Sequence, residues 1–182
     1  MRYHALVALD ALLGWLGLER AKSDREDQAP LRRLLESLDH LDSDRARHLA
    51  RFAYLLGRVA RADQHVSEGE TAAMEAIVVE ECGLAADQAV VVVGLAKSAN
   101  LLFGGTADFE VARDFGAQAT YPERLSLVRC LFRLAATDAA ISVAEESELH
   151  RIANQLQIAP EDLTELRVAH ARFLPGLAPR TP

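Results

Sequence analysis

The sequence predicts an all-α protein, a helical bundle of about seven to nine helices. Apolar residues recur at spacings of three and four along almost the whole chain, which is the period of an amphipathic helix. Two segments, each made of a helix, a short acidic loop and a second helix, also align when the chain is shifted by 75 residues. The 182 residues are 50% hydrophobic and 26% charged, which suits one domain with a sizeable core.

The first half of the chain contains five predicted helices. Each follows from an apolar stripe together with a residue suited to a helix end. Ser43 and Asp44 are N-cap residues, Pro30 suits a first turn, and Gly83 suits the position after a last turn. A valine cluster makes a strand the alternative for the fifth helix. The predicted helices are His4–Leu16, one from Pro30 after the charged connector Glu19–Ala29, one from Ser43 or Asp44, Ser67–Cys82, and about Ala86–Asn100.

Four more helices are predicted after the break at Gly104 and Gly105. The first spans about Asp108–Gln118. Pro122, Ser142 and Pro160 then open the other three, since proline fits a first turn and serine caps one. The segment Pro175–Pro182 has three prolines and no apolar period, so we expect a flexible tail at 175–182.

Charge and hydropathy argue against several classes of partner. The net charge of −7 opposes nucleic-acid binding and docking on anionic lipid. The apolar run Ala89–Ala96 is too short for a transmembrane segment, and Asp10 interrupts Met1–Leu18, so that segment is not a signal peptide. Cys82 and Cys130 lie in apolar helical patterns and are expected to be reduced, buried thiols.

The internal repeat places two acidic loops in equivalent positions. Leu56–Asp63 aligns with Leu131–Asp138, and Val66–Glu70 aligns with Ile141–Glu145. In each copy a serine stands three residues before a glutamate, the spacing of a capping box, and an apolar residue precedes the serine as a hydrophobic staple would. A helical hairpin cannot bury its apolar face alone, so the two copies are expected to pack on each other.

The two loop aspartates fit a capping role less well than the glutamates. Asp63 continues the apolar stripe that ends at Val59, and Asp138 continues the stripe that ends at Leu134. A buried carboxylate needs a partner, which could be loop amides or a cation. If the loops meet, Asp63, Glu70, Asp138 and Glu145 could bind a divalent cation, namely calcium, magnesium, manganese or zinc.

Other candidate ligands and catalytic groups are sparse. His65 could add a nitrogen ligand in the first loop, but its counterpart in the second is Ala140. Glu146 and His150 stand one helical turn apart, a spacing typical of zinc ligands and of solvated surface pairs alike. The chain has no phosphate-binding loop and no nucleophile or zinc-protease motif, so no catalytic residue and no organic cofactor is predicted.

The segments Ala60–Glu70 and Ala135–Glu145 resemble the repeated signature of the TerB-like family, which includes the tellurite-resistance protein TerB and a region of the co-chaperone DjlA. The stretch Tyr121–Asp162 is similar to small stand-alone TerB-domain proteins of bacteria. The resemblance covers about Leu49–Phe173 and implies an all-helical domain at 46–174. The predicted N-terminal helices at 1–45 lie outside the resemblance. The resemblance also implies a cytoplasmic bacterial protein whose acidic face, here Asp63, Glu70, Asp138 and Glu145, binds a divalent cation.

The function expected from these features is that of a non-enzymatic helical interaction module, acting in bacterial stress response or in membrane-associated complexes. Its partner would be an unidentified protein, and the chain could form a homodimer through the leucine face of Met1–Leu18. Two alternatives stay open: a small metal-dependent enzyme, and a purely structural or oligomerising protein.

Overall fold

The computed structural model describes residues 43–60, 68–102, 108–138 and 140–176. These residues form seven α-helices and no strand, so the all-α class is confirmed for this part of the chain. The predicted helices His4–Leu16 and the one from Pro30 lie outside it, as does most of the predicted tail. The helices are α3 (Ser43–Ala60), α4 (Glu68–Cys82), α5 (Ala86–Leu102), α6 (Asp108–Gln118), α7 (Tyr121–Ala135), α8 (Val143–Gln155) and α9 (Pro160–Ala169).

Helix ends lie close to where the sequence predicts them, because the signals that set them are local. α3 begins at Ser43, and Ser142 caps α8. α7 begins one residue before Pro122, which takes a position in the first turn. Gly83 follows α4 with φ of 62°, a left-handed conformation that costs a side chain energy but costs glycine little.

The valine-rich segment is helical, which decides between the two alternatives the sequence left open. α5 runs to Leu102, two residues beyond the predicted end. Its β-branched residues tolerate the helix because most of them are packed: Val91, Val92 and Val93 are all buried, and only Val90 is exposed. Tertiary packing therefore overrides a modest local preference for strand.

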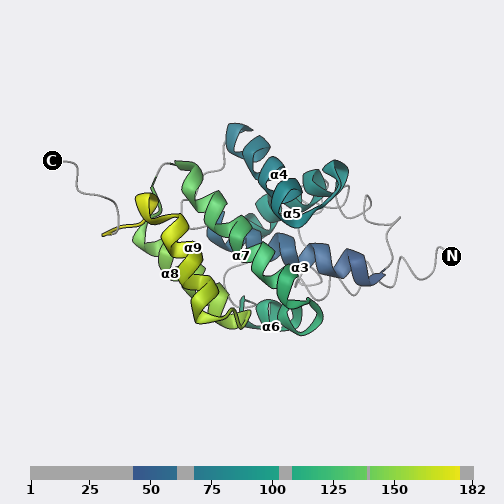
Figure 1. Cartoon of the computed structure of the whole chain (residues 1–182). Coiled ribbons are helices and arrows are strands. Elements are labelled where there is room, and N and C mark those ends of the chain that lie inside the picture. The colour runs from purple at the N-terminus through teal and green to yellow at the C-terminus, as the bar shows by residue number, and fades with distance from the viewer. Residues whose placement is uncertain (1–42, 61–67, 103–107, 139, 177–182) are drawn as a thin grey trace.

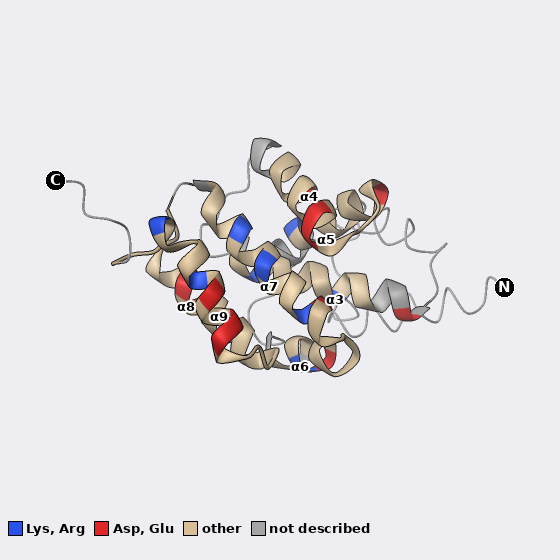
Figure 2. Ribbon diagram, in the orientation of Figure 1, with Lys and Arg blue, Asp and Glu red and all other residues tan. Residues whose placement is uncertain are grey.

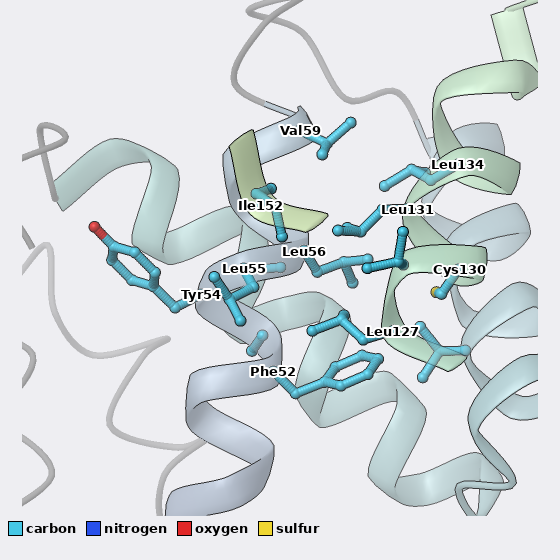
Figure 3. Packing of buried hydrophobic residues seen from close by; sticks show 14 of the residues in the cluster. Phe52, Tyr54, Leu55, Leu56, Val59, Leu127, Cys130, Leu131, Leu134 and Ile152 are labelled. Atoms are coloured by element: carbon cyan, nitrogen blue, oxygen red, sulfur yellow. The ribbon is translucent and has the colours of Figure 1, made fainter. Parts of the chain in front are cut away.

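α3 lies at the centre of the bundle and packs against α5, α6, α7 and α8 (Figure 1). Its apolar face meets that of α7, and in Figure 3 the side chains of Leu56 and Val59 lie opposite Leu131 and Leu134. α4 and α5 cover one side of this central pair, and α8 and α9 cover the other. None of the described helices combines the length and apolar character needed to cross a membrane.

Candidate functional site

The structure describes the four predicted cation ligands to different extents. Asp63 lies outside the described residues, together with His65 and the capping serine Ser67. Glu70 lies in the first turn of α4, and Asp138 ends a short 3₁₀ helix, Ala136–Asp138, that continues α7; only their backbones are described. Glu145 is the one predicted ligand whose side chain is described.

Glu145 serves the capping role that the sequence predicts. The Ser142 backbone N–H donates to Glu145 Oε2 at 2.7 Å, and the Glu145 N–H donates to Ser142 Oγ at 3.2 Å. The carboxylate is buried, with 3% of the residue exposed, at a helix N-terminus where the dipole favours negative charge. Ile141, just before the cap, is also buried, and its N–H donates to the Phe173 carbonyl at 2.7 Å.

The backbone before Asp138 departs from the regular helix that the sequence pattern assumes. α7 ends at Ala135, and the next three residues tighten into the 3₁₀ turn. Thr137 Oγ1 donates to the Leu134 carbonyl at 2.7 Å, so a side chain satisfies one of the last carbonyls of α7. The stripe through Leu127, Leu131 and Leu134 is buried as predicted, but α-helical spacing no longer holds at Asp138.

Glu146, which forms the candidate zinc pair with His150, makes a contact that the sequence pattern does not reveal. Glu146 Oε1 accepts from Arg167 Nη2 of α9 at 2.7 Å, and both side chains are partly buried. Figure 2 shows acidic and basic residues side by side on α8 and α9. Among the described residues, no three His, Cys, Asp or Glu side chains are grouped closely enough to bind a metal.

A buried ion pair that the sequence analysis missed joins α3 to α8. Arg58, in the last turn of α3, donates from Nε to Glu148 Oε1 at 2.7 Å and from Nη1 to Gln155 Oε1 at 2.8 Å. Its side chain is 0% exposed, and that of Glu148 is 14% exposed. Arg58 is two residues before the end of α3, so the pair fixes the last turn of α3 against α8.

Arg133 makes the corresponding contact from the second copy. Its Nη1 lies 2.8 Å from Glu80 Oε2 and 2.8 Å from Glu81 Oε1, both on α4. Under the 75-residue shift, Arg58 aligns with Arg133 and Glu80 aligns with Gln155. Each half therefore contacts the other reciprocally, as two copies related by an approximate twofold axis would. The duplication itself stays a prediction, and these contacts agree with it.

A second polar cluster ties the start of α7 to the turn between α8 and α9. The Tyr121 hydroxyl hydrogen-bonds to Asp162 and accepts from the Ala159 N–H at 3.1 Å. Arg124 donates to the Leu156 carbonyl at 2.8 Å and lies over the Tyr121 ring. The hydrogen bond to Asp162 is the main cause that raises the pKa of Tyr121. The cluster links both ends of Tyr121–Asp162, the stretch that carries part of the family resemblance.

The turn after α8 has the hydrogen bonds of a Schellman motif. The Ile158 N–H donates to the Ala153 carbonyl at 3.0 Å, and the Gln157 N–H donates to the Asn154 carbonyl at 3.1 Å. Gln157 takes the left-handed position with φ of 54°, where glycine is usual. The motif sets the direction in which the chain enters α9, and hence the position of Asp162.

The two cysteines are both free, as the sequence predicts. Cys130, on α7, is buried in the core (Figure 3). Cys82, the last residue of α4, is only half-buried, so the prediction that it is a buried thiol is wrong. Its position at the end of a helix explains the exposure, because fewer neighbours cover the final turn. The neighbouring Cys82 thiol, together with burial, raises the pKa of the Cys130 thiol.

Comparisons with known proteins agree with this arrangement. No curated protein and no solved structure matches the chain. The family described as tellurite resistance protein TerB matches residues 48–168, from the first turns of α3 to the last turn of α9. The match covers about two thirds of the sequence and includes both acidic loops and both inter-helix arginines. The chain therefore belongs to the TerB family.

Proposed function

We propose that the chain is a non-catalytic TerB module that acts in tellurite resistance or a related bacterial stress response, by binding a protein partner in a cation-responsive way. The observation that carries this proposal is the family match across residues 48–168. It spans all the helices described here and both acidic loops, so the resemblance applies to the whole bundle and not to one motif.

The contacts of the described polar residues support a binding role over a catalytic one. Glu146 and Glu148 are engaged with Arg167 and Arg58, so these carboxylates hold helices together. The ring of His170 lies against Phe132 at a centroid distance of 5.5 Å, and its Nδ1 faces the Leu166 carbonyl at 2.9 Å. Each of these side chains contacts another part of the fold, as side chains that stabilise a scaffold do.

The cation part of the proposal concerns the acidic loops. Carboxylate oxygens are the ligands that calcium, magnesium and manganese prefer. Glu145 fits this role least, because one carboxylate oxygen already accepts the Ser142 N–H. We therefore assign the main ligand role to Asp63 and Asp138. Glu145 sets the start of α8 and so the length of the second loop.

Genetic complementation tests the biological role. The gene is deleted in the source bacterium, and growth is measured over a series of potassium tellurite concentrations. We expect the deletion to increase sensitivity and the wild-type chain to restore growth. The Asp63→Asn, Asp138→Asn double variant should fail to restore it, whereas Glu165→Gln, an exposed carboxylate on α9, should succeed. A deletion strain with unchanged tellurite sensitivity would overturn the assignment to tellurite resistance.

Calorimetric titration of the purified full chain tests the cation role separately. Calcium, magnesium, manganese and zinc are each titrated into the wild type, the double aspartate variant and Glu145→Gln. We expect binding in the wild type, loss of binding in the double variant, and a smaller change for Glu145→Gln. No binding at roughly millimolar cation, the weak end of protein calcium sites, removes the cation part.

A further inference from the structure

The face of α9 that points away from the bundle carries an exposed valine. Val168 is 69% exposed, the highest value for a large hydrophobic side chain among the described residues. Leu163 and Leu166 are buried and mark the inner face of the helix. Arg172, one turn beyond Val168, is exposed. The exposed residues of α9 itself recur at spacings of three and four on the side opposite the buried leucines: Glu161, Thr164, Glu165, Val168 and Ala169.

Charge changes in a fixed order along this outer face of α9. The face is acidic at Glu161 in the first turn, apolar at Val168 near the end of the helix, and basic at Arg172 beyond the end. Figure 2 shows acidic residues along α9 and a basic residue past its carboxyl end. Thr164 extends the apolar part, because its hydroxyl already donates to the Pro160 carbonyl at 2.7 Å.

The two charged ends of the outer face have no ion-pair partner within the described part of the chain. Glu161 and Arg172 are eleven positions apart in the sequence, about 16 Å along a helix, so they are too far apart to pair with each other. The Arg172 guanidinium lies over the Phe173 ring at 4.4 Å. A guanidinium stacked in this way still presents N–H groups at its edge, where a carboxylate can bind.

A second exposed valine extends the apolar surface onto α8. Val143, the first residue of α8, is 67% exposed. The Ile141 N–H donates to the Phe173 carbonyl at 2.7 Å, which holds the start of α8 beside the 3₁₀ turn that follows α9. The ion pair between Glu146 and Arg167 holds the first turns of α8 against α9. Val143 therefore lies beside the carboxyl end of the outer face of α9.

We propose that the outer face of α9 binds a second copy of this chain, antiparallel to it and related by a twofold axis. The order acidic, apolar, basic becomes basic, apolar, acidic when the helix is reversed, so this face is complementary to itself. Glu161 of each copy pairs with Arg172 of the partner subunit, and the contact forms twice. Between these pairs, Val168 of each copy packs against Thr164 and Val168 of the partner subunit.

The size of the outer face sets the strength of the dimer. One helix face and one neighbouring valine bury less than the roughly 800 Å² per partner of a standard stable complex. The dimer should therefore be reversible, with a Kd in the micromolar range or weaker. This inference goes beyond the proposed function and does not depend on it, because the contacts require neither tellurite nor a cation.

Sedimentation equilibrium of the purified full chain tests the proposal. The wild type is measured from about 10 μM to about 1 mM, a range that covers weak interfaces. We expect a monomer–dimer equilibrium. Val168→Lys should raise the Kd by tenfold or more, because it places two cations at the centre of the contact. Val90→Lys is the matched control, since this valine on α5 is 49% exposed and lies outside the outer face of α9, and it should leave the Kd unchanged.

Charge reversal tests the pairing of Glu161 with Arg172. Glu161→Arg and Arg172→Glu should each raise the Kd by about tenfold, because each change replaces two attractive contacts with two repulsive ones. An equimolar mixture of these two variants should regain the wild-type affinity as a heterodimer, because each reversed residue then faces a residue of opposite charge. The double variant should also dimerise as the wild type does.

Three results would overturn the proposal. The first is a wild-type chain that stays monomeric at about 1 mM. The second is a dimer that Val168→Lys does not weaken, which would place the contact elsewhere, for example on the leucine face of Met1–Leu18. The third is a mixture of the two reversal variants that stays as weak as each variant alone, although circular dichroism shows that both are folded. If a reversal variant fails to fold, the comparison of Val168→Lys with Val90→Lys decides.

Discussion

Removal of the Arg58 side chain should destabilise the fold more than any other single change to a charged residue described here. Arg58 lies on α3 with a side chain that is 0% exposed, and it contacts Glu148 and Gln155 on α8. Arg58→Ala would leave Glu148, 14% exposed, with Arg151 as its ion-pair partner, and that side chain is 61% exposed. Breaking a buried ion pair by removal of one partner costs about 3–5 kcal/mol. Because Glu148 keeps its ion pair with Arg151 and some contact with water, we expect the lower end of this range, about 3 kcal/mol.

The repeat offers a matched control at Arg133. This residue occupies the equivalent place in the second copy, but its side chain is 37% exposed and that of Glu80 is 61% exposed. Solvent screens such a pair, and exposed pairs contribute roughly 0.2–1 kcal/mol. Arg133→Ala should therefore cost about a quarter of what Arg58→Ala costs. Burial is the main difference between the two arginines, since Arg133 has two carboxylate partners, Glu80 and Glu81, and Arg58 has one, Glu148.

Urea unfolding of the full chain, followed by circular dichroism, measures both free energies of unfolding. The expected loss for Arg58→Ala corresponds to a decrease in Tm of about 6–12 °C for a chain of this size. The double variant Arg58→Met, Glu148→Leu should recover much of the loss, because it replaces the charges with apolar contact. Equal losses for Arg58→Ala and Arg133→Ala would refute the reasoning from burial.

Three further changes test the local contacts. Gln157→Gly should raise the free energy of unfolding by about 0.5–1 kcal/mol in urea titrations, because glycine removes the left-handed strain at the end of α8; an unchanged or lower value would contradict this. Glu145→Ala should lower it by about 1 kcal/mol by removing half of the capping box, with or without added cation; a loss seen only with cation present would instead indicate a ligand role. Tyr121→Phe should destabilise the chain at neutral pH but not in strong alkali. The raised pKa of Tyr121 means that its contribution is complete below about pH 10, the ordinary tyrosine pKa, and is lost as pH rises through the higher value in the folded chain. Urea titrations at about pH 9 and about pH 11 measure the difference in free energy of unfolding between the wild type and this variant. A difference that is the same at both pH values would contradict the prediction.

Helix positions were predictable because they depend on nearby residues. Ser43, Ser142 and Pro160 act on the turn that they start, and Gly83 acts on the turn that it ends. The fifth helix was the exception in principle, since its valines favour a strand locally. This segment is helical because most of its valines are buried. The sequence indicates the helix only by the lack of a second valine-rich segment that could pair with it as a strand.

Contacts between helices were not predictable, because periodicity shows which face is apolar but not what covers it. Arg58 meets Glu148 across 90 residues of sequence, and Arg133 meets Glu81 across 52. The left-handed conformation of Gln157 is also unsignalled, because glutamine rarely takes it.

The candidate site was predictable in part. The capping role of Glu145 is confirmed, because a capping box is a local motif with a fixed spacing. Asp138 would continue the core stripe only if α-helical spacing extended beyond Ala135, where a 3₁₀ turn replaces it. The metal-ligand roles of Asp63, Glu70, Asp138 and Glu145 stay predictions. A helix period shows where each loop lies in the sequence but not whether the two loops meet in space, and titration with divalent cations tests these roles.

The central place of α3 has a consequence for synthesis of the protein on the ribosome. α3 leaves the ribosome early, but Arg58 can contact Gln155 only after a further 97 residues have been synthesised. Until α8 has left the exit tunnel, the apolar face of α3 is in contact with water. So is the Arg58 side chain, which is buried in the folded protein. The amino-terminal half therefore cannot complete its fold while the carboxyl-terminal half is still being translated. Nascent chains should depend on holding chaperones during that interval, and ribosome-stalled chains that end before α8 should be sensitive to protease.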